Sequence, residues 1–160
     1  MKHLLCMVIE NDGAFFVKEI MNPNVVSLGP NASLKDAAEL MAQQKIGSIV
    51  IVDNNEPIGI ITERDFATKI MLQPYFADSK VSEVMSSPVV HITSTQSVAD
   101  VIDIMANKDI RKVPVIENGK VIGIVTGTEF LRLFVQATDE DMQKAYQQYV
   151  KRVYSNWFKE

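Results

Sequence analysis

Cysteine and histidine are scarce in this sequence, and their scarcity excludes several kinds of site. Cys6 is the only cysteine among 160 residues, so the chain cannot form an internal disulfide, which is typical of a protein kept in a reducing cytoplasm. The two histidines, His3 and His91, show neither metal-ligand spacing nor a recognisable nucleophile and base arrangement. No glycine-rich phosphate loop is present, because "NGKVIG" is typical of a hairpin turn. The sequence favours a protein that is not an enzyme and has no metal or obligatory cofactor.

Long apolar runs and an excess of positive charge are also missing. No apolar run approaches the ~20 residues that a membrane-spanning helix needs, so we expect no membrane contact. The formal net charge of -4 argues against a general nucleic-acid binder, because neutralising a phosphate backbone needs a cationic face. With 47% hydrophobic and 22% charged residues, the composition is that of a globular protein. The sequence therefore predicts a cytoplasmic protein of one domain or two very small ones.

An internal repeat is the strongest feature that is present. "GIITERDF" at Gly59–Phe66 returns as "GIVTGTEF" at Gly123–Phe130, an offset of 64 residues. The same offset aligns all of Val17–Phe66 with Val81–Phe130 without a gap. Of these 50 aligned positions 16 are identical, whereas chance at average composition gives roughly three. The chain therefore contains two copies of one structural unit.

Each copy contains the signals of an amphipathic helix. Ser33 and Ser97 stand where an N-cap belongs, with Asp36 and Asp100 three residues later, which is the spacing of a capping box. Apolar residues then recur at i, i+3, i+4 and i+7. They are Leu34, Ala37, Ala38 and Met41 in the first copy and Val98, Val101, Ile102 and Met105 in the second.

The rest of each copy reads as three strands and a second helix, so each copy is predicted to be β-α-β-β-α and the fold class to be α+β. A brief strand is expected at Val25–Val26 and at Val89–Val90. Two apolar runs then flank a hairpin turn, at Asp53–Pro57 and at Glu117–Lys120, the second turn containing the strong hairpin signal Asn118-Gly119. The second helix begins near Glu63 and near Thr128.

The chain divides by this pattern into five segments. These are an N-terminal extension (1–16), the first repeat (17–72), a linker (73–80), the second repeat (81–138) and a C-terminal amphipathic helix (139–160). The last helix carries three tyrosines and Trp157 on a wide apolar stripe. It either packs on the body of its own chain or forms a surface for a second copy or another partner, where Tyr and Trp are common.

The repeated motifs resemble the paired CBS domain, or Bateman module. They are the opening "V-x-x-h-M" of each copy (Val17–Met21, Val81–Met85), "R-K-V-P-V" at Arg111–Val115 and "G-h-h-T-x-x-D" at Gly59–Asp65, and the resemblance covers about residues 15 to 135. It implies two repeats packed as a pseudo-twofold pair, a homodimer, and clefts that in many members bind adenosine-containing ligands and regulate a partner protein. Other members of the family bind nothing known.

The resemblance implies a first ligand site in which the acid of one repeat faces the basic and apolar segment of the other. Asp65 would accept hydrogen bonds from ribose hydroxyls beside Thr62, and Arg111 and Lys112 would contact phosphate. The alternatives are that Thr62 and Asp65 only cap the following helix and that the two cations are solvated on a strand edge. The predicted site consists of Thr62, Arg64, Asp65, Val90, Ile92, Arg111, Lys112, Val113 and Pro114, although for Arg64 a role as a surface or dimer-contact residue is favoured over ligand contact.

The second site implied by the same symmetry departs from the family pattern. Glu129 replaces the aspartate, and Gly47 and Ser48 occupy the places of the two cations. This site is therefore expected to bind phosphates weakly, to take an uncharged adenosine derivative, or to be empty. Its predicted residues are Val26, Leu28, Ile46, Gly47, Ser48, Ile49, Thr126 and Glu129.

The sequence thus predicts a cytoplasmic sensor that binds AMP, ADP, ATP or S-adenosylmethionine and modulates a protein partner. The alternative is a ligand-independent dimerisation module that works through its C-terminal helix. Binding to nucleic acid or membrane is not expected.

Overall fold

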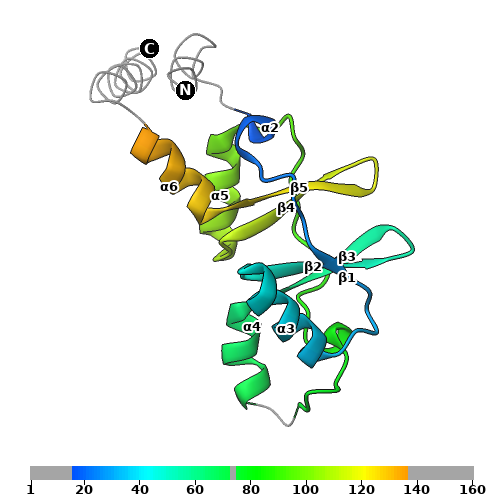
Figure 1. Ribbon diagram of the computed structural model, residues 1–160. Coiled ribbons are helices and arrows are strands. Elements are labelled where there is room, and N and C mark those ends of the chain that lie inside the picture. The colour runs from blue at the N-terminus through cyan, green and yellow to red at the C-terminus, as the bar shows by residue number, and fades with distance from the viewer. Residues whose placement is uncertain (1–15, 73–74, 137–160) are drawn as a thin grey trace, which may run out of the picture. The chain divides into compact units, whose positions relative to one another are not determined.

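The computed structural model describes residues 16–72 and 75–136, whose elements follow the order of two β-α-β-β-α repeats (Figure 1). A mixed α+β fold is therefore confirmed, while the predicted C-terminal helix, 139–160, lies outside the described residues. The first repeat contains α2 (Val17–Ile20), β1 (Ser27–Leu28), α3 (Leu34–Gln44), β2 (Ser48–Asp53), β3 (Glu56–Thr62), α4 (Glu63–Thr68) and the 3-10 helix η1 (Ile70–Leu72). The second contains the 3-10 helix η2 (Val81–Glu83), α5 (Val98–Lys108), β4 (Lys112–Glu117), β5 (Lys120–Thr126) and α6 (Gly127–Gln136).

The first strand of each repeat begins later than the sequence suggested. The prediction of a strand at Val25–Val26 is wrong, because the Val25 amide donates to the carbonyl of Pro23 at 3.1 Å, within a turn. Pairing starts where the Val26 carbonyl accepts the amide of Val50, and β1 then runs parallel to β2. In the second repeat the predicted strand at Val89–Val90 is also absent, and an isolated parallel bridge between Ile92 and Val115 takes its place.

Both predicted hairpins are present, each closed by a tight two-residue turn. Asn54 and Asn55 join β2 to β3 with φ of 47° and 68°, and Asn118 and Gly119 join β4 to β5 with φ of 50° and 75°. Positive φ at both central residues is the geometry whose twist matches that of antiparallel strands. The first turn is shorter than predicted, because pairing in β2 and β3 continues to their ends.

The amphipathic helices are capped as predicted. The Asp36 amide donates to the Ser33 hydroxyl oxygen at 3.0 Å, while the Ser33 amide donates to the Asp36 carboxylate at 3.0 Å. The same reciprocal bonds join Ser97 and Asp100, at 3.1 and 3.2 Å. The predicted stripe is only partly buried, since Ala38 and Ile102 at i+4 are exposed, whereas the residues at i+3 and i+7 are buried in both helices.

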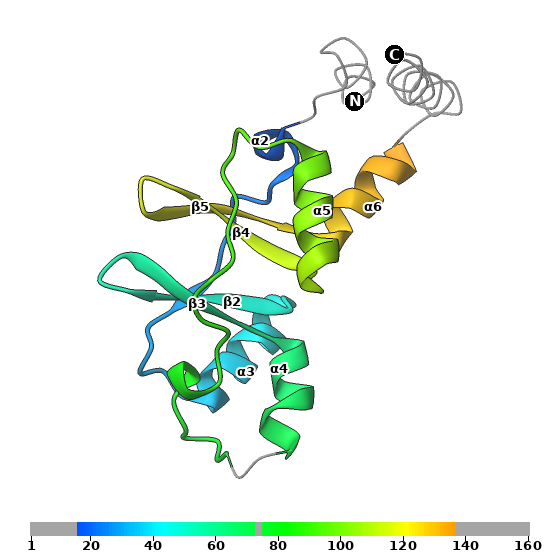
Figure 2. The same ribbon diagram turned by 180° about the vertical axis from the view of Figure 1, so that it is seen from behind.

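The described residues form two compact units that do not coincide with the two repeats. The first unit combines the residues up to Ile20, the segment 95–111 and the residues from Thr126 onward. The second unit combines 21–94 with 112–125, and so contains the β2–β3 hairpin and nearly all of the β4–β5 hairpin (Figure 2). Each repeat therefore contributes to both units.

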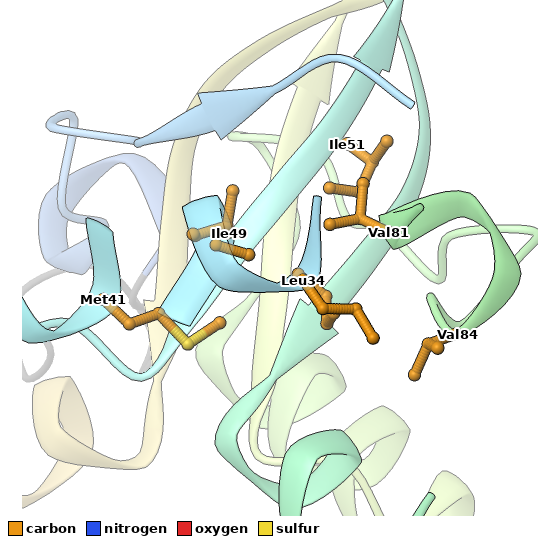
Figure 3. Close-up of a cluster of buried hydrophobic side chains, with 8 residues drawn as sticks. Leu34, Met41, Ile49, Ile51, Val81 and Val84 are labelled. Atoms are coloured by element: carbon orange, nitrogen blue, oxygen red, sulfur yellow. The ribbon is translucent and has the colours of Figure 1, made fainter. Parts of the chain in front are cut away.

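The core of the second unit shows how the repeats exchange their opening segments (Figure 3). Val81 and Val84, from the opening of the second repeat, pack among buried residues of α3 and β2 from the first repeat. Beyond them, Ser86 and Ile60 exchange backbone hydrogen bonds of 3.1 and 2.9 Å. The buried cluster consists of Leu34, Ala37, Met41, Ile49, Ile51, Ile61, Val81 and Val84.

The opening of the first repeat makes the equivalent contacts with β5. The amides of Asn22 and Ile124 each donate to the other's carbonyl at 2.9 Å. At both places a glycine admits a methionine, since a Cβ on Gly123 would lie 2.7 Å from the sulfur of Met21. The motif glycines thus allow close packing of the exchanged segments.

We expect Gly59→Ala to destabilise the protein by about 1–3 kcal/mol, because overpacking a tight contact forces neighbouring atoms to move. A Cβ there would lie 3.0 Å from Met85 Cγ and 3.1 Å from the Ser86 carbonyl oxygen. Chemical denaturation measures the effect, with Gly29→Ala as the control because a Cβ at Gly29 has nothing within 4 Å. Equal stability of the two variants would contradict the contact.

The Ser33 cap should also be visible in the titration of Asp36. Hydrogen bonds from the hydroxyl and amide of Ser33 lower the pKa of the Asp36 carboxyl, so the stabilisation they provide is present above the ordinary carboxyl pKa and is lost as the pH falls through the lowered value. We expect Ser33→Ala to raise the Asp36 pKa in an NMR titration. Ser27→Ala, at an exposed position, should leave it unchanged, and a similar rise in that control would refute the assignment.

Candidate functional site

A buried carboxylate lies where β3 passes into α4. Thr62 ends β3 at the N-cap of α4, and Asp65, 6% exposed, is the third residue of that helix. One carboxylate oxygen, Oδ2, accepts the Thr62 amide at 2.8 Å and the Thr62 hydroxyl at 2.6 Å. The contact expected of a helix cap is therefore present, and whether Asp65 also binds a ligand depends on its remaining capacity.

Lys69 is a partner of Asp65 that the sequence analysis missed. Its ammonium lies 2.7 Å from Asp65 Oδ1 and also donates to the Val84 carbonyl at 2.9 Å and the Ser86 hydroxyl at 3.3 Å. An ammonium has three N–H donors, so each has an acceptor. The spacing of four residues on one helix was a readable signal for the ion pair. Lys69 fixes the acid of the first repeat to the opening segment of the second.

Asp65 keeps room for one further hydrogen bond. A carboxylate offers about four acceptor positions, of which Thr62 takes two at Oδ2 and Lys69 takes one at Oδ1. One ribose hydroxyl can therefore be added at Oδ1 without breaking an existing bond. The second hydroxyl of a ribose can donate to the Thr62 oxygen, which uses its own proton on Asp65 and keeps its lone pairs.

The ammonium of Lys112, from the second repeat, lies beside the first residue of α4. Its ammonium donates to the Gly47 carbonyl and lies 3.4 Å from Glu63 Oε2. The same carbonyl accepts the Glu63 amide at 3.2 Å, and Glu63 directly follows Thr62. The Lys112 side chain is 25% exposed, so it is not a freely solvated charge on a strand edge.

Gly47 belongs to the surroundings of Lys112, although it was predicted for the second site. A Cβ at this position would clash with the ammonium of Lys112 and with the carboxylate of Glu63. The absence of a side chain at Gly47 is therefore what lets these two charged groups meet. The sequence shows a glycine at position 47 where the second repeat has Arg111, but it does not indicate that Lys112 and Glu63 meet beside this glycine.

The apolar residues predicted for the first site are mostly inaccessible. Ile92 is 1% exposed and Val113 and Pro114 are fully buried, with the Ile92 amide donating to the Pro114 carbonyl at 3.0 Å. Their side chains therefore offer no surface to a ligand, whereas Val90, which is half-buried, keeps accessible surface.

The two predicted arginines are exposed. The carbonyl of Arg64 accepts the Thr68 hydroxyl at 2.7 Å. Arg111 lies in the first unit, where its carbonyl accepts the Gly127 amide at 3.1 Å. A contact of either arginine with a ligand stays a prediction.

Glu129 reproduces the cap of Asp65 despite its additional methylene. It is 8% exposed, accepts the Thr126 amide at 2.9 Å and the Thr126 hydroxyl at the same oxygen, and lies 3.6 Å from the guanidinium of Arg132. Thr126 and Glu129 belong to the first unit, and the other predicted residues of the second site belong to the second unit. Of those, Ile49 is buried and Val26, Leu28, Ile46, Gly47 and Ser48 are half-buried.

Other kinds of site receive no support in the part of the chain that the structure describes. Within residues 16–72 and 75–136, no three His, Cys, Asp or Glu side chains are grouped to hold a metal ion. The helices described there include none with the length and apolarity to span a membrane. His91 is exposed, with its ring nitrogen Nδ1 3.4 Å from the Val89 carbonyl.

Comparison with known proteins identifies the family. The model of the CBS domain matches residues 17–72 and 81–136, so the chain belongs to the CBS-domain family and contains a pair of these domains. The uncharacterized protein MK0525 of Methanopyrus kandleri is 36% identical over 137 residues, covering 82% of this chain and 70% of the relative. The CBS domain-containing protein YhcV of Bacillus subtilis is 34% identical over 109 residues, covering 68% and 78%.

A solved structure shares the fold and contains ligands. The CBS domain pair of protein MJ0100, in complex with 5′-methylthioadenosine and S-adenosyl-L-methionine, matches with a TM-score of 0.70 and 30% identity, covering 76% of this chain and 97% of that one. The resemblance to a CBS-domain pair is thus confirmed. Such pairs are typically regulatory modules rather than catalytic ones.

Replacing Lys69 by methionine should show what the Asp65 ion pair contributes to stability. We expect Lys69→Met to destabilise the protein by about 1–2 kcal/mol, because a buried carboxylate loses its cation, although partial exposure of Lys69 moderates the loss. Lys35→Met is the matched control, since its pair with Glu39 at 3.8 Å is exposed on both sides and should contribute under about 0.5 kcal/mol. Chemical denaturation of both variants measures the difference, and equal losses would refute the special role of Lys69.

Proposed function

We propose that this CBS-domain pair is a cytoplasmic sensor that binds an adenosine-containing ligand at Thr62 and Asp65 and thereby regulates a protein partner. The observation that carries the proposal is the buried Asp65 carboxylate, which is held in place by Thr62 and Lys69 and keeps an open acceptor position. A fixed acceptor next to a hydroxyl oxygen suits the two neighbouring hydroxyls of a ribose, because little order is lost when they bind.

The surroundings of Asp65 add groups for the rest of the ligand. Lys112 supplies a cation beside Glu63, which lies two residues before Asp65. The related pair of protein MJ0100 is in complex with two adenosine derivatives, which supports the same ligand class here. AMP, ADP, ATP, S-adenosylmethionine and 5′-methylthioadenosine are the candidates, and a homodimer is the proposed assembly.

Regulation would follow from the fact that the residues of this site come from both repeats. Thr62 and Asp65 belong to the first repeat and Lys112 to the second, while Lys69 ties Asp65 to Val84. A ligand that contacts both repeats favours whichever arrangement of them it binds more tightly, and only by that difference in affinity. A partner protein that distinguishes the two arrangements would then sense the ligand.

The direct test is calorimetric titration of the full chain with each of the five candidate ligands. We expect at least one to bind, and we expect Asp65→Asn to weaken it by about ten- to a hundredfold, since a hydrogen bond to a charged group contributes about 1.5–3 kcal/mol. Asp103→Asn, at an exposed position of α5, is the control and should leave the affinity unchanged.

Two results would contradict the proposal. Binding that Asp65→Asn leaves intact, with the fold verified by NMR, would move the ligand away from this acid. No heat and no thermal shift with any of the five would favour the alternative of a ligand-independent dimerisation module, whose predicted helix, 139–160, lies outside the described residues.

A further inference from the structure

The cation that would attract a phosphate already has an anion beside it. Lys112 Nζ lies 3.4 Å from Glu63 Oε2, and the Gly47 carbonyl holds both the Lys112 ammonium and the Glu63 amide. The Glu63 side chain is 71% exposed, whereas that of Lys112 is 25% exposed. The carboxylate is therefore the more solvent-exposed member of the pair.

The pair occurs once in the chain although the repeat occurs twice. At the offset of 64 residues, Ser48 stands in the place of Lys112 and Gly127 in the place of Glu63. A Cβ at Gly127 would have nothing within 4 Å, so packing does not require a glycine there. Both charges are thus particular to the site that contains Asp65, with Glu63 from the first repeat and Lys112 from the second, and neither has a charged counterpart in the other copy.

From this arrangement we propose that Glu63 is a selectivity residue of the Asp65 site, which reduces binding of phosphorylated adenosine ligands relative to unphosphorylated ones. The inference rests on the proposed function. With Glu63 next to Lys112, the pair has no net charge, and a phosphate gains from the lysine roughly what it loses to the glutamate. A ligand whose 5′ group is uncharged experiences neither effect.

The chemistry of two small ligands isolates this effect. AMP carries a phosphate with about -1.5 to -2 charges at neutral pH, whereas 5′-methylthioadenosine has the same adenosine and no phosphate. Contacts to the base and ribose are common to both, so a change at Glu63 that acts through charge alters the affinity for AMP only. Such an effect weakens with salt, because the screening length is about 10 Å at 0.1 M and about 3 Å at 1 M.

The experiment is calorimetric titration of the full chain and its variants with AMP and with 5′-methylthioadenosine. Glu63→Gln keeps the shape of the side chain, and we expect it to raise the affinity for AMP by about three- to tenfold. This is the effect of removing a unit charge several ångströms from a phosphate in water. The affinity for 5′-methylthioadenosine should change by less than about twofold, and the gain for AMP should shrink in 1 M NaCl.

Two matched variants complete the test. Lys112→Met should lower the affinity for AMP and leave the affinity for 5′-methylthioadenosine unchanged. Glu39→Gln removes an exposed carboxylate of α3 that pairs with Lys35 instead, and should leave both ligands unchanged.

The possible outcomes separate this inference from the proposed function. If the wild-type chain binds either ligand and Glu63→Gln changes both equally or neither, the selectivity role is overturned while the adenosine site stands. If Glu39→Gln raised the affinity for AMP as much as Glu63→Gln, the selectivity role of Glu63 would also be overturned, because the net charge of the chain would then explain the effect. If neither wild-type nor Glu63→Gln chains bind either ligand, this inference fails, while the proposed function is decided by the titration with all five candidate ligands.

Discussion

The exchange of opening segments between the repeats is the constraint on which the rest of the second unit depends. In the short stretch from Val84 to Ser86, Val84 packs in the first repeat's core, Ser86 pairs with β3 and Met85 packs against Gly59. The same stretch supplies two of the three acceptors of Lys69. Because Lys69 in turn holds Asp65, the acid at the candidate site is positioned by a segment of the other repeat. Core packing and site geometry therefore cannot vary independently, and a change in one is felt in the other.

The same acid meets a structural demand and, under the proposed function, a functional one. A carboxylate that is 6% exposed is costly unless its oxygens are hydrogen-bonded, and Thr62 and Lys69 meet that need without any ligand. Under the proposed function, a ribose would add to an already satisfied group, using the remaining acceptor position of Asp65 and the hydroxyl oxygen of Thr62. Under the proposed function, discrimination among adenosine ligands would come from the groups that meet the rest of the molecule, and these include the charges of Glu63 and Lys112.

The features that the sequence predicted correctly are those determined within a few residues. The caps at Ser33 and Ser97 and the turn at Asn118-Gly119 depend on hydrogen bonds and backbone angles over at most four positions. The first strand was misplaced because its start is decided by pairing with β2, more than 20 residues away. The contact of Lys112 with Gly47 joins residues 65 positions apart, and no local pattern indicates it. For the site, the sequence identified the acid and the lysine, but not the partners that determine what each can still bind.

Asp65 and Glu129 show that the acid is not what distinguishes the two copies. Each is buried and each accepts the amide and hydroxyl of the threonine three residues before it, so the additional methylene of Glu129 does not prevent the cap. The copies differ in the charges around the acid: Lys69, Lys112 and Glu63 correspond to Leu133, Ser48 and Gly127. The cap is common to both copies, so the surrounding charges are what can make the two sites differ in recognition. Within one repeated fold, the two sites thus differ in the charges that a ligand would meet.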